Sequence, residues 1–335
     1  MGCGYASHAL RLSALSACEA NCLTATTAVP RLIGGVLLLR FCFGIAVVKA
    51  ASPTCTAELA QQIPARSAEA PTGSALVKRT MDLNGKARDT VVSAEVLSGN
   101  IPSFLRHLMP VQLSGKRPDG SNVQVTICVT PDYLSIGNNR DFVRIPMGLP
   151  AAAEIADRFG FLLPTTRMVD AIYSQAGLHL EPSPMEANSL MRSTKYLWLH
   201  NQTVERQCAG VDRTLNELIA GQKKDLVLSN RLRTYTGRVA IYGWHRMNGV
   251  PIQPLSTVHG AQYADYSHGV RLVSTTAFVN GVPQPLEKLL QDPRYAWIVS
   301  SEGPIVEAGT LQASLCQQRA ETVHAVSLRS STAFN

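Results

Sequence analysis

The spacing of apolar and polar residues changes along the chain, and each change predicts a different kind of secondary structure. Apolar and polar residues alternate in Val123-Gln-Val-Thr-Ile-Cys-Val-Thr130, which is the pattern of a half-buried strand. Turn residues follow, and the short apolar run at 141–145 predicts another strand. The two runs together indicate a small antiparallel unit.

A helical period begins at Pro150. Proline is tolerated in the first turn of a helix, and the apolar residues after it recur at helical spacing until Gly160. Thr165 or the threonine after it is suited to cap a second helix, which Gly177 ends. A third helix is predicted at 188–208, so three helices follow the first strands.

Strand patterns return after Gly237. Asn248-Gly249 is the preferred central pair of a type I′ turn, and it predicts a hairpin in which His245 faces Ile252. A second pair of this kind, Asn280-Gly281, predicts another hairpin. The C-terminal third therefore resembles the region around residue 123 in being built from strands.

Strands at both ends with helices between them predict an α+β fold, with a mixed or antiparallel sheet and a helical segment inserted between the N- and C-terminal strand regions. A single globular domain is predicted at 91–306. Residues 51–90 are rich in Ala, Ser, Thr and Pro and predict a flexible linker. Residues 307–335 show little periodicity and predict a loose C-terminal tail.

The first 50 residues contain a targeting pattern. Arg31 and Arg40 flank and interrupt an apolar stretch that ends at Val48, and the small pair Ala50-Ala51 follows, as in a cleaved export signal. Only about 17 apolar residues are available, with an arginine among them, so no stable membrane span is expected after cleavage. Residues 1–29 do not fit the signal and indicate a misassigned upstream extension, with Val29 as a candidate start. The mature protein is predicted to be periplasmic or secreted and bacterial.

Cysteine usage agrees with export. Four cysteines remain after the predicted signal, and none of them forms a Cys-x-x-Cys pair: Cys55, Cys128, Cys208 and Cys316. In an oxidising compartment they predict up to two disulfides, with three possible pairings. Four free thiols are the alternative.

Composition narrows the possible partners. The chain is 45% apolar, which is enough for a substantial core, and its net charge of +7 is spread rather than clustered. Without basic blocks interleaved with aromatic residues, nucleic acid is not an expected partner. A phosphate loop and a dinucleotide fingerprint are both absent from the sequence, which argues against a nucleotide-dependent enzyme.

The strongest chemical candidate is the run His259-Gly-Ala-Gln-Tyr-Ala-Asp265-Tyr-Ser-His268. Two imidazoles and a carboxylate supply either metal ligands or a base with its orienting acid. His268 is predicted as base or ligand, Asp265 as its orienter or co-ligand, and His259 as a second ligand or acid. A divalent metal such as zinc would be the cofactor. An extended strand would point Asp265 and His268 apart, so the prediction requires a bend between them, and a structural role for the whole run is the alternative.

Residues around this run are candidates for substrate binding. Aromatic rings beside polar groups form stacking platforms for sugars, and an arginine fork suits a carboxylate. On these grounds the predicted substrate-binding residues are Trp244, His245, Tyr263, Ser267 and Arg271.

The same run partly resembles a known signature. His259-Gly260 followed by Ser267-His268-Gly269-Val270-Arg271 is similar to the L,D-transpeptidase pattern, in which His-Gly precedes Ser-His-Gly-Cys-x-Arg. Val270 stands where that family has its nucleophilic cysteine, and one residue is missing before the arginine. The family's cysteine chemistry is therefore not expected. A wider series of short motifs resembles a family of exported bacterial proteins with no assigned activity: Tyr242-Gly-Trp-His245, Pro251-Ile-Gln-Pro-Leu255, Asp265-Tyr-Ser-His-Gly269 and Ser301-Glu-Gly-Pro-Ile305.

These observations predict an exported hydrolase that acts on an envelope or extracellular polymer, either peptide or glycan. The alternative is a non-catalytic ligand-binding protein of the periplasm or extracellular space, with Trp244 and the tyrosines as its stacking surface. Either protein would take a small-molecule or polymer ligand.

Overall fold

The computed structural model describes residues 55–209 and 217–316. Its main sheet has the order β1-β2-β12-β13, and a short fifth strand pairs with β12. These strands are β1 (Met109–Lys116), β2 (Asn122–Val129), β5 (Phe161–Leu162), β12 (Val273–Val279) and β13 (Val282–Pro285). All neighbours in this sheet are antiparallel.

A second sheet has the order β10-β9-β8-β11. It consists of β8 (Lys224–Leu226), β9 (Ile241–His245), β10 (Pro251–Ser256) and β11 (His268–Gly269). The β8–β11 pair is parallel and the others are antiparallel. Two small sheets pair β3 (Ser135–Gly137) with β4 (Phe142–Arg144), and β6 (Leu178–His179) with β7 (Ile219–Ala220).

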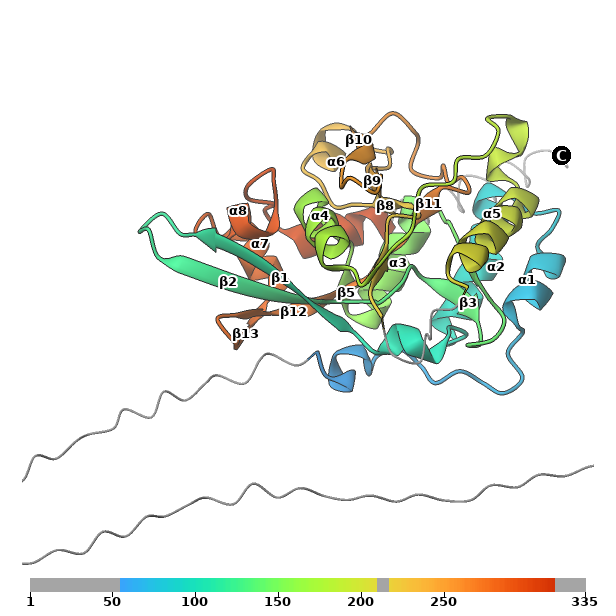
Figure 1. Ribbon diagram of the computed structural model, residues 1–335, viewed down its shortest axis with the longest axis horizontal. Helices are drawn as coiled ribbons and strands as arrows, with labels where there is room; N and C mark the ends of the chain where they lie inside the picture. Colours follow the sequence, from blue (N-terminus) through green and yellow to red (C-terminus); the bar gives the residue numbers. More distant parts are fainter. Residues whose placement is uncertain (1–54, 210–216, 317–335) are drawn as a thin grey trace, which may run out of the picture. The chain divides into compact units, whose positions relative to one another are not determined.

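Helices separate the strands along the chain and pack against both sheets (Figure 1). The α-helices are α1 (Gly73–Arg79), α2 (Gly85–Leu97), α3 (Leu149–Phe159), α4 (Thr166–Gln175), α5 (Thr194–Gln207), α6 (Arg231–Thr234), α7 (Leu286–Gln291) and α8 (Ala296–Val299). The named 3-10 turns of the described residues are η1 (Ala57–Ala60), η2 (Ser103–Arg106) and η3 (Ser189–Arg192). Mixed and antiparallel sheets with intervening helices confirm the predicted α+β fold.

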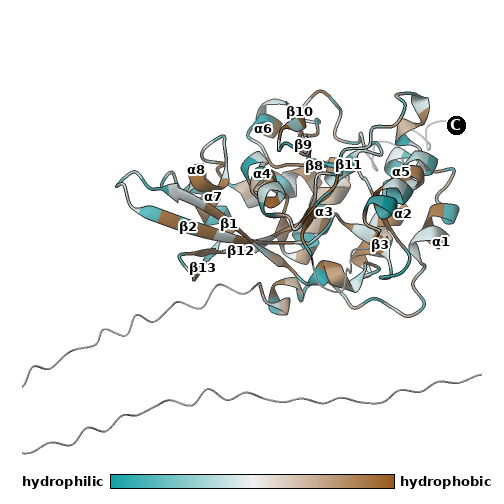
Figure 2. Cartoon of the chain, in the orientation of Figure 1, coloured by the Kyte–Doolittle hydropathy of each residue, from teal (hydrophilic) through white to brown (hydrophobic). Residues whose placement is uncertain are grey.

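The helix signals in the sequence act as predicted. Thr165 caps α4 by accepting a hydrogen bond from the backbone N–H of Met168, and Gly160 ends α3 in the left-handed conformation at φ 75°. Eight of the 11 residues of α3 are buried. Apolar residues of α3 and of the inner part of β2 contribute to one large core, whereas α5 carries polar residues on its outer side (Figure 2).

The predicted linker is wrong for residues 55–90, because this segment is folded. Thr72 caps α1, and α1 and α2 bury Leu76, Val77, Val92 and Val96 in the core. The predicted loose tail is also wrong at its beginning. Residues 308–316 are helical, and the side-chain amide of Gln312 bonds the backbone of Phe161 and Leu163. The folded region therefore extends beyond 91–306 on both sides.

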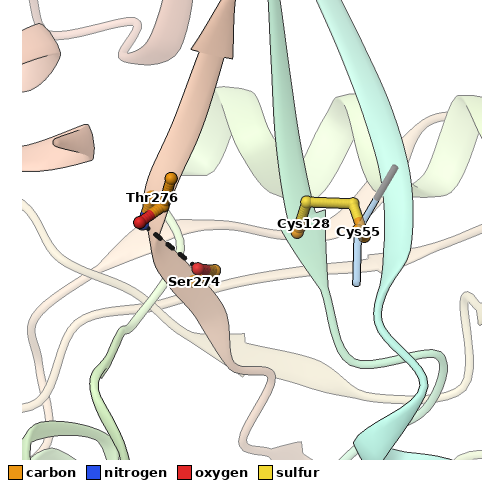
Figure 3. The surroundings of a disulfide bond; sticks show 4 residues. All are labelled: Cys55, Cys128, Ser274 and Thr276. Atoms are coloured by element: carbon orange, nitrogen blue, oxygen red, sulfur yellow. Dashed lines mark hydrogen bonds between the residues drawn. A yellow bond between two sulfur atoms is a disulfide. The ribbon is translucent and has the colours of Figure 1, made fainter. Parts of the chain in front are cut away.

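A disulfide joins the start of the described chain to the centre of the main sheet. Cys55 is bonded to Cys128 of β2, beside the point where β12 is bulged (Figure 3). At the bulge the backbone N–H of Thr276 donates to Ser274 Oγ over 3.1 Å. One disulfide is thus confirmed, and Cys316 is a free thiol.

The two predicted hairpins have different outcomes. Asn280 and Gly281 both have positive φ and join Val279 directly to Val282, as a type I′ turn requires. At the other hairpin five residues separate the paired ends, because His245 pairs with Pro251 rather than Ile252. Only Gly249 has positive φ there, so the Asn-Gly pair lies in a longer loop.

The described part of the chain contains no helix that is both long and apolar enough to cross a membrane. The predicted export signal and the upstream extension fall on residues 1–54, outside the described residues.

Candidate functional site

The run predicted to carry chemistry ends in β11 and is bent where the prediction required. Asp265 Oδ1 accepts hydrogen bonds from the backbone N–H of Ser267 at 2.8 Å and from its hydroxyl at 2.6 Å. This local turn directs the Asp265 carboxylate toward the residues that follow it, and its Oδ2 lies 3.9 Å from His268 Nε2. Asp265 and His268 are therefore brought together.

His259 is not part of this pair. Its imidazole is exposed and stacks on the Tyr263 ring, with 4.0 Å between ring centroids. The rings of Tyr263 and His268 meet edge to face, with 5.6 Å between their centroids. Within residues 55–209 and 217–316, no group of three or more His, Cys, Asp or Glu side chains is arranged to hold a metal ion. The predicted metal set His259, Asp265 and His268 is therefore not assembled, because the aromatic ring of Tyr263 contacts both imidazoles.

Asp265 and His268 are also closed to solvent. His268 is 0% exposed, and neither of its ring nitrogens has a hydrogen-bond partner among the described residues. Burial lowers the pKa of His268 to about 4, although the charge of Asp265 opposes this shift. Burial would raise the pKa of Asp265, but His268 and the donors of Ser267 outweigh it and lower that pKa to about 2. A neutral imidazole thus lies beside a carboxylate out of reach of substrate.

A lysine that the sequence did not single out lies next to this pair. The parallel pairing of β11 with β8 brings Lys223 alongside, and its Nζ bonds His200 Nδ1 at 3.1 Å and the Tyr266 carbonyl at 2.6 Å. Burial lowers the pKa of Lys223 to about 7 and, with the charge of Lys223, lowers that of His200 to about 2. We call Lys223, His200, Asp265 and His268 the buried cluster. It joins α5 to β8 and β11.

The depressed pKa of Lys223 predicts a pH dependence of stability. An unfolded lysine titrates near 10.4, so between about pH 7 and 10 the unfolded chain binds a proton that the folded chain does not. The contribution of Lys223 to the free energy of unfolding should therefore increase with pH across this range, by at most about 1.4 kcal/mol per pH unit. Urea denaturation of wild type and Lys223→Met from pH 6.5 to 9 measures it. A constant difference between the two proteins would mean that Lys223 keeps its proton.

Two residues predicted to bind substrate have structural roles instead. Trp244 is only 5% exposed and packs with Tyr196, Leu197 and Tyr266, so its face is not a stacking platform. Arg271 is fully buried, where it donates to the carbonyls of two neighbouring segments and lies 4.3 Å from the Tyr133 ring. It is not available to a substrate carboxylate.

His245, another of the predicted substrate-binding residues, belongs to a second polar group, between β9 and α4. His245 Nε2 lies 3.0 Å from Oδ1 of Asp170, a residue of α4. The hydroxyl of Tyr242 donates to the same oxygen at 2.8 Å, and Tyr173 stacks on the imidazole with 4.5 Å between centroids. The Asp170 side chain is 52% exposed, whereas the His245 side chain is 3% exposed. The pair therefore joins an exposed carboxylate to a nearly buried imidazole. We call the pair the Asp170–His245 dyad.

The hydrogen bonds of the dyad set the tautomer of His245. An ionised carboxylate only accepts hydrogen bonds, so Nε2 carries the proton that is donated to Asp170. In the neutral ring the lone pair is then on Nδ1. Nδ1 bonds no described residue. Nδ1 is therefore the proton-accepting nitrogen of a ring that is 3% exposed.

A second carboxylate lies behind the dyad. Asp225 is 2% exposed and accepts a hydrogen bond from the Tyr133 hydroxyl at 2.8 Å. Burial raises its pKa to about 6, against the opposing charge of Arg271. The backbone approaches closely here, because a Cβ on Gly243 would be 3.5 Å from both Asp225 Oδ2 and His245 Cε1.

The next residue is strained. Trp244 has φ 58°, which is unusual for a bulky side chain and typical of functional sites. The strain lies in β9, one residue before His245.

The sequence contained one clue to the dyad. Asp170 and Tyr173 are three residues apart in the predicted second helix, so they share one face of it. In the structure that face contacts β9, and both residues meet His245. For Lys223 and His200 no clue existed, because their contact depends on the parallel pairing of two short strands with α5 packed beside them.

Comparison with known proteins gives no assignment. No protein-family model, no curated protein and no solved structure matches this chain. Its function has to follow from the geometry of its own side chains.

Proposed function

We propose that this protein is an exported hydrolase that cleaves acyl bonds in an envelope or extracellular polymer, with His245 as general base and Asp170 as its positioning residue. The observation that carries the proposal is the 3.0 Å contact between Nε2 of the nearly buried His245 and Oδ1 of the exposed Asp170. A base oriented by a carboxylate, with its second nitrogen not engaged by a described residue, is an arrangement that general base catalysis uses.

The proposed reaction uses one proton transfer in each direction. His245 Nδ1 removes a proton from a water molecule, and the resulting hydroxide attacks the carbonyl carbon of the acyl bond. The imidazolium then gives the proton to the departing nitrogen or oxygen as the acyl bond breaks. Asp170 stabilises the imidazolium between the two steps, and the second donor on its carboxylate, Tyr242, keeps it in place.

The acyl bond is favoured over a glycosidic bond by the number of reachable carboxylates. Glycoside hydrolysis in most families needs two carboxyl groups on either side of the bond. Of the two carboxylates next to His245, Asp170 is exposed and Asp225 is 2% exposed. The peptide part of an envelope polymer is therefore the better candidate than its glycan part.

Export is supported by two independent features. The apolar stretch before Ala50-Ala51 has the form of a cleaved signal, and the Cys55–Cys128 disulfide fits an oxidising compartment. These features support a location outside the cytoplasm, where an envelope polymer is within reach.

The proposal is tested with the exported chain, carrying its disulfide, on isolated peptidoglycan, peptide amides and p-nitrophenyl esters. Hydrolysis by wild type and a loss of about 10-fold or more in Asp170→Asn are expected, because asparagine cannot stabilise the imidazolium. His107→Gln, which changes an exposed imidazole elsewhere, should be unaffected. Loss of activity in His259→Gln but not in Asp170→Asn would place the reaction at the run 259–268 instead.

The alternative of a non-catalytic binding protein loses its main support. It relied on Trp244 as a stacking surface, and this side chain is buried. The exposed imidazole of His259, stacked on Tyr263, is the remaining flat surface of the predicted group. Unchanged substrates throughout the hydrolysis assays would favour this alternative.

A further inference from the structure

A separate pocket of about 340 Å³ lies between α5 and the chain leading into β4. This volume is at the lower end of the range for small-molecule sites. The pocket shares no residue with the Asp170–His245 dyad or with the buried cluster. Six of its lining residues matter here: Arg140, Asp141, Trp198, Gln202, Glu205 and Arg206.

The two acidic groups of the pocket are already engaged by the protein. Asp141 accepts hydrogen bonds from the backbone N–H of Ser74 at 2.8 Å and from its hydroxyl at 2.6 Å. Glu205 forms a 2.6 Å ion pair with the buried Arg144. Both carboxylates are therefore held in the walls of the pocket.

The two basic groups are exposed and keep most of their donors. Arg206 uses one nitrogen to donate to Thr203 Oγ1 at 2.9 Å. In the described part of the chain neither Arg140 nor Arg206 is paired with a carboxylate. Because the acids are engaged and the arginines are not, the pocket offers donors that suit a carboxylate.

One face of α5 adds an aromatic ring and an amide. Trp198, Gln202 and Arg206 are spaced four residues apart, so they lie along one side of the helix. The indole of Trp198 is half-buried and packs against the core, which restricts its motion while it lines the pocket. The order along the helix is thus a ring, a hydrogen-bonding amide and a cation.

We propose that this pocket binds a sugar ring that bears a carboxylate. The carboxylate pairs with Arg140 and Arg206, the apolar face of the ring rests on Trp198, and ring hydroxyls bond the Gln202 amide. This site is independent of the proposed hydrolase activity. It provides the protein with an anchor on acidic polysaccharide or glycopeptide.

Isothermal titration with methyl glucuronide, and with methyl glucoside as its neutral counterpart, tests the proposal on the full exported chain. Methyl glucuronide should bind at least about 10-fold more tightly than methyl glucoside, because one charged hydrogen-bond pair is worth that much. Arg206→Gln and Arg140→Gln should each weaken methyl glucuronide binding by about 10-fold. Arg158→Gln, which removes an exposed arginine from α3, should leave it unchanged.

A further variant tests whether the ring is recognised. Trp198→Leu should weaken both glycosides, and thermal melts of all variants show whether the fold is kept. Equal affinity for the two glycosides would overturn the proposal, as would acetate competing as well as methyl glucuronide. The absence of measurable methyl glucuronide binding to wild type would also overturn it. None of these results depends on whether the protein is a hydrolase.

Discussion

Replacing His245 with glutamine is expected to lower kcat/KM for hydrolysis by about 10²- to 10⁴-fold, the usual contribution of a positioned general base. Glutamine has a similar length, and its amide can still donate to Asp170. Its remaining oxygen cannot take up a proton near neutral pH. The substitution therefore removes the base while the contact between β9 and α4 remains possible.

The loss of activity has to be separated from loss of structure. Thermal melts of His245→Gln should remain close to those of wild type, because the stacked position on Tyr173 is still filled. His107→Gln is the matched control, since it changes the same side chain at an exposed position outside the dyad. Full activity in a folded His245→Gln protein would exclude His245 as the base.

Removing the disulfide is expected to have the largest effect on stability. The Cys55–Cys128 bond closes a loop with a sequence separation of 73 residues. For a loop of this length the chain-entropy relation gives a loss of about 4 kcal/mol in the free energy of unfolding. The predicted result for Cys55→Ser is a large decrease in the urea midpoint of unfolding.

The control is Cys316→Ser, because Cys316 is a free, partly buried thiol. Its urea midpoint should change little under the same conditions. If Cys55→Ser were as stable as Cys316→Ser, the segment before α1 would not be held to β2 by the disulfide in solution.

Local features of the fold were readable from the sequence because a few adjacent residues decide them. Asn280-Gly281 adopts positive φ at both positions and forms the predicted two-residue turn. Thr165 and Gly160 cap their helices as expected. In each case the backbone preference of the residue agrees with the packing around it.

The hairpin at Asn248-Gly249 shows where local preference is overridden. The same dipeptide predicts the same turn, but His245 pairs with Pro251 and the loop is longer. The strand before it contains the positive φ angles of Gly243 and Trp244, which alter its course before the turn is reached. A shift of one residue in register moves every side chain to the other face of the sheet.

The segment before residue 91 was misjudged for a different reason. Its Ala, Ser and Thr content resembles a linker, but α2 buries the charged side chains of Arg88 and Asp89 along with its valines. Buried charges do not follow the apolar pattern of a helix. The amino-acid composition of this segment therefore did not reveal that the folded domain begins before residue 91.

The candidate site was half predictable. Asp265 and His268 are three residues apart in the sequence, so a single turn brings them into contact. The Asp170–His245 contact joins residues 75 apart, so it depends on how α4 packs on β9. The sequence placed His245 near the site and Asp170 on a helix face, but only the tertiary packing joins the two.

A double-mutant cycle of Asp170→Asn and His245→Gln tests the central claim most directly, with kcat/KM as the readout. If Asp170 acts only through His245, the double variant should be no slower than His245→Gln alone, within about twofold. If the two losses multiply in the double variant, Asp170 and His245 act separately, and the dyad is not the catalytic unit.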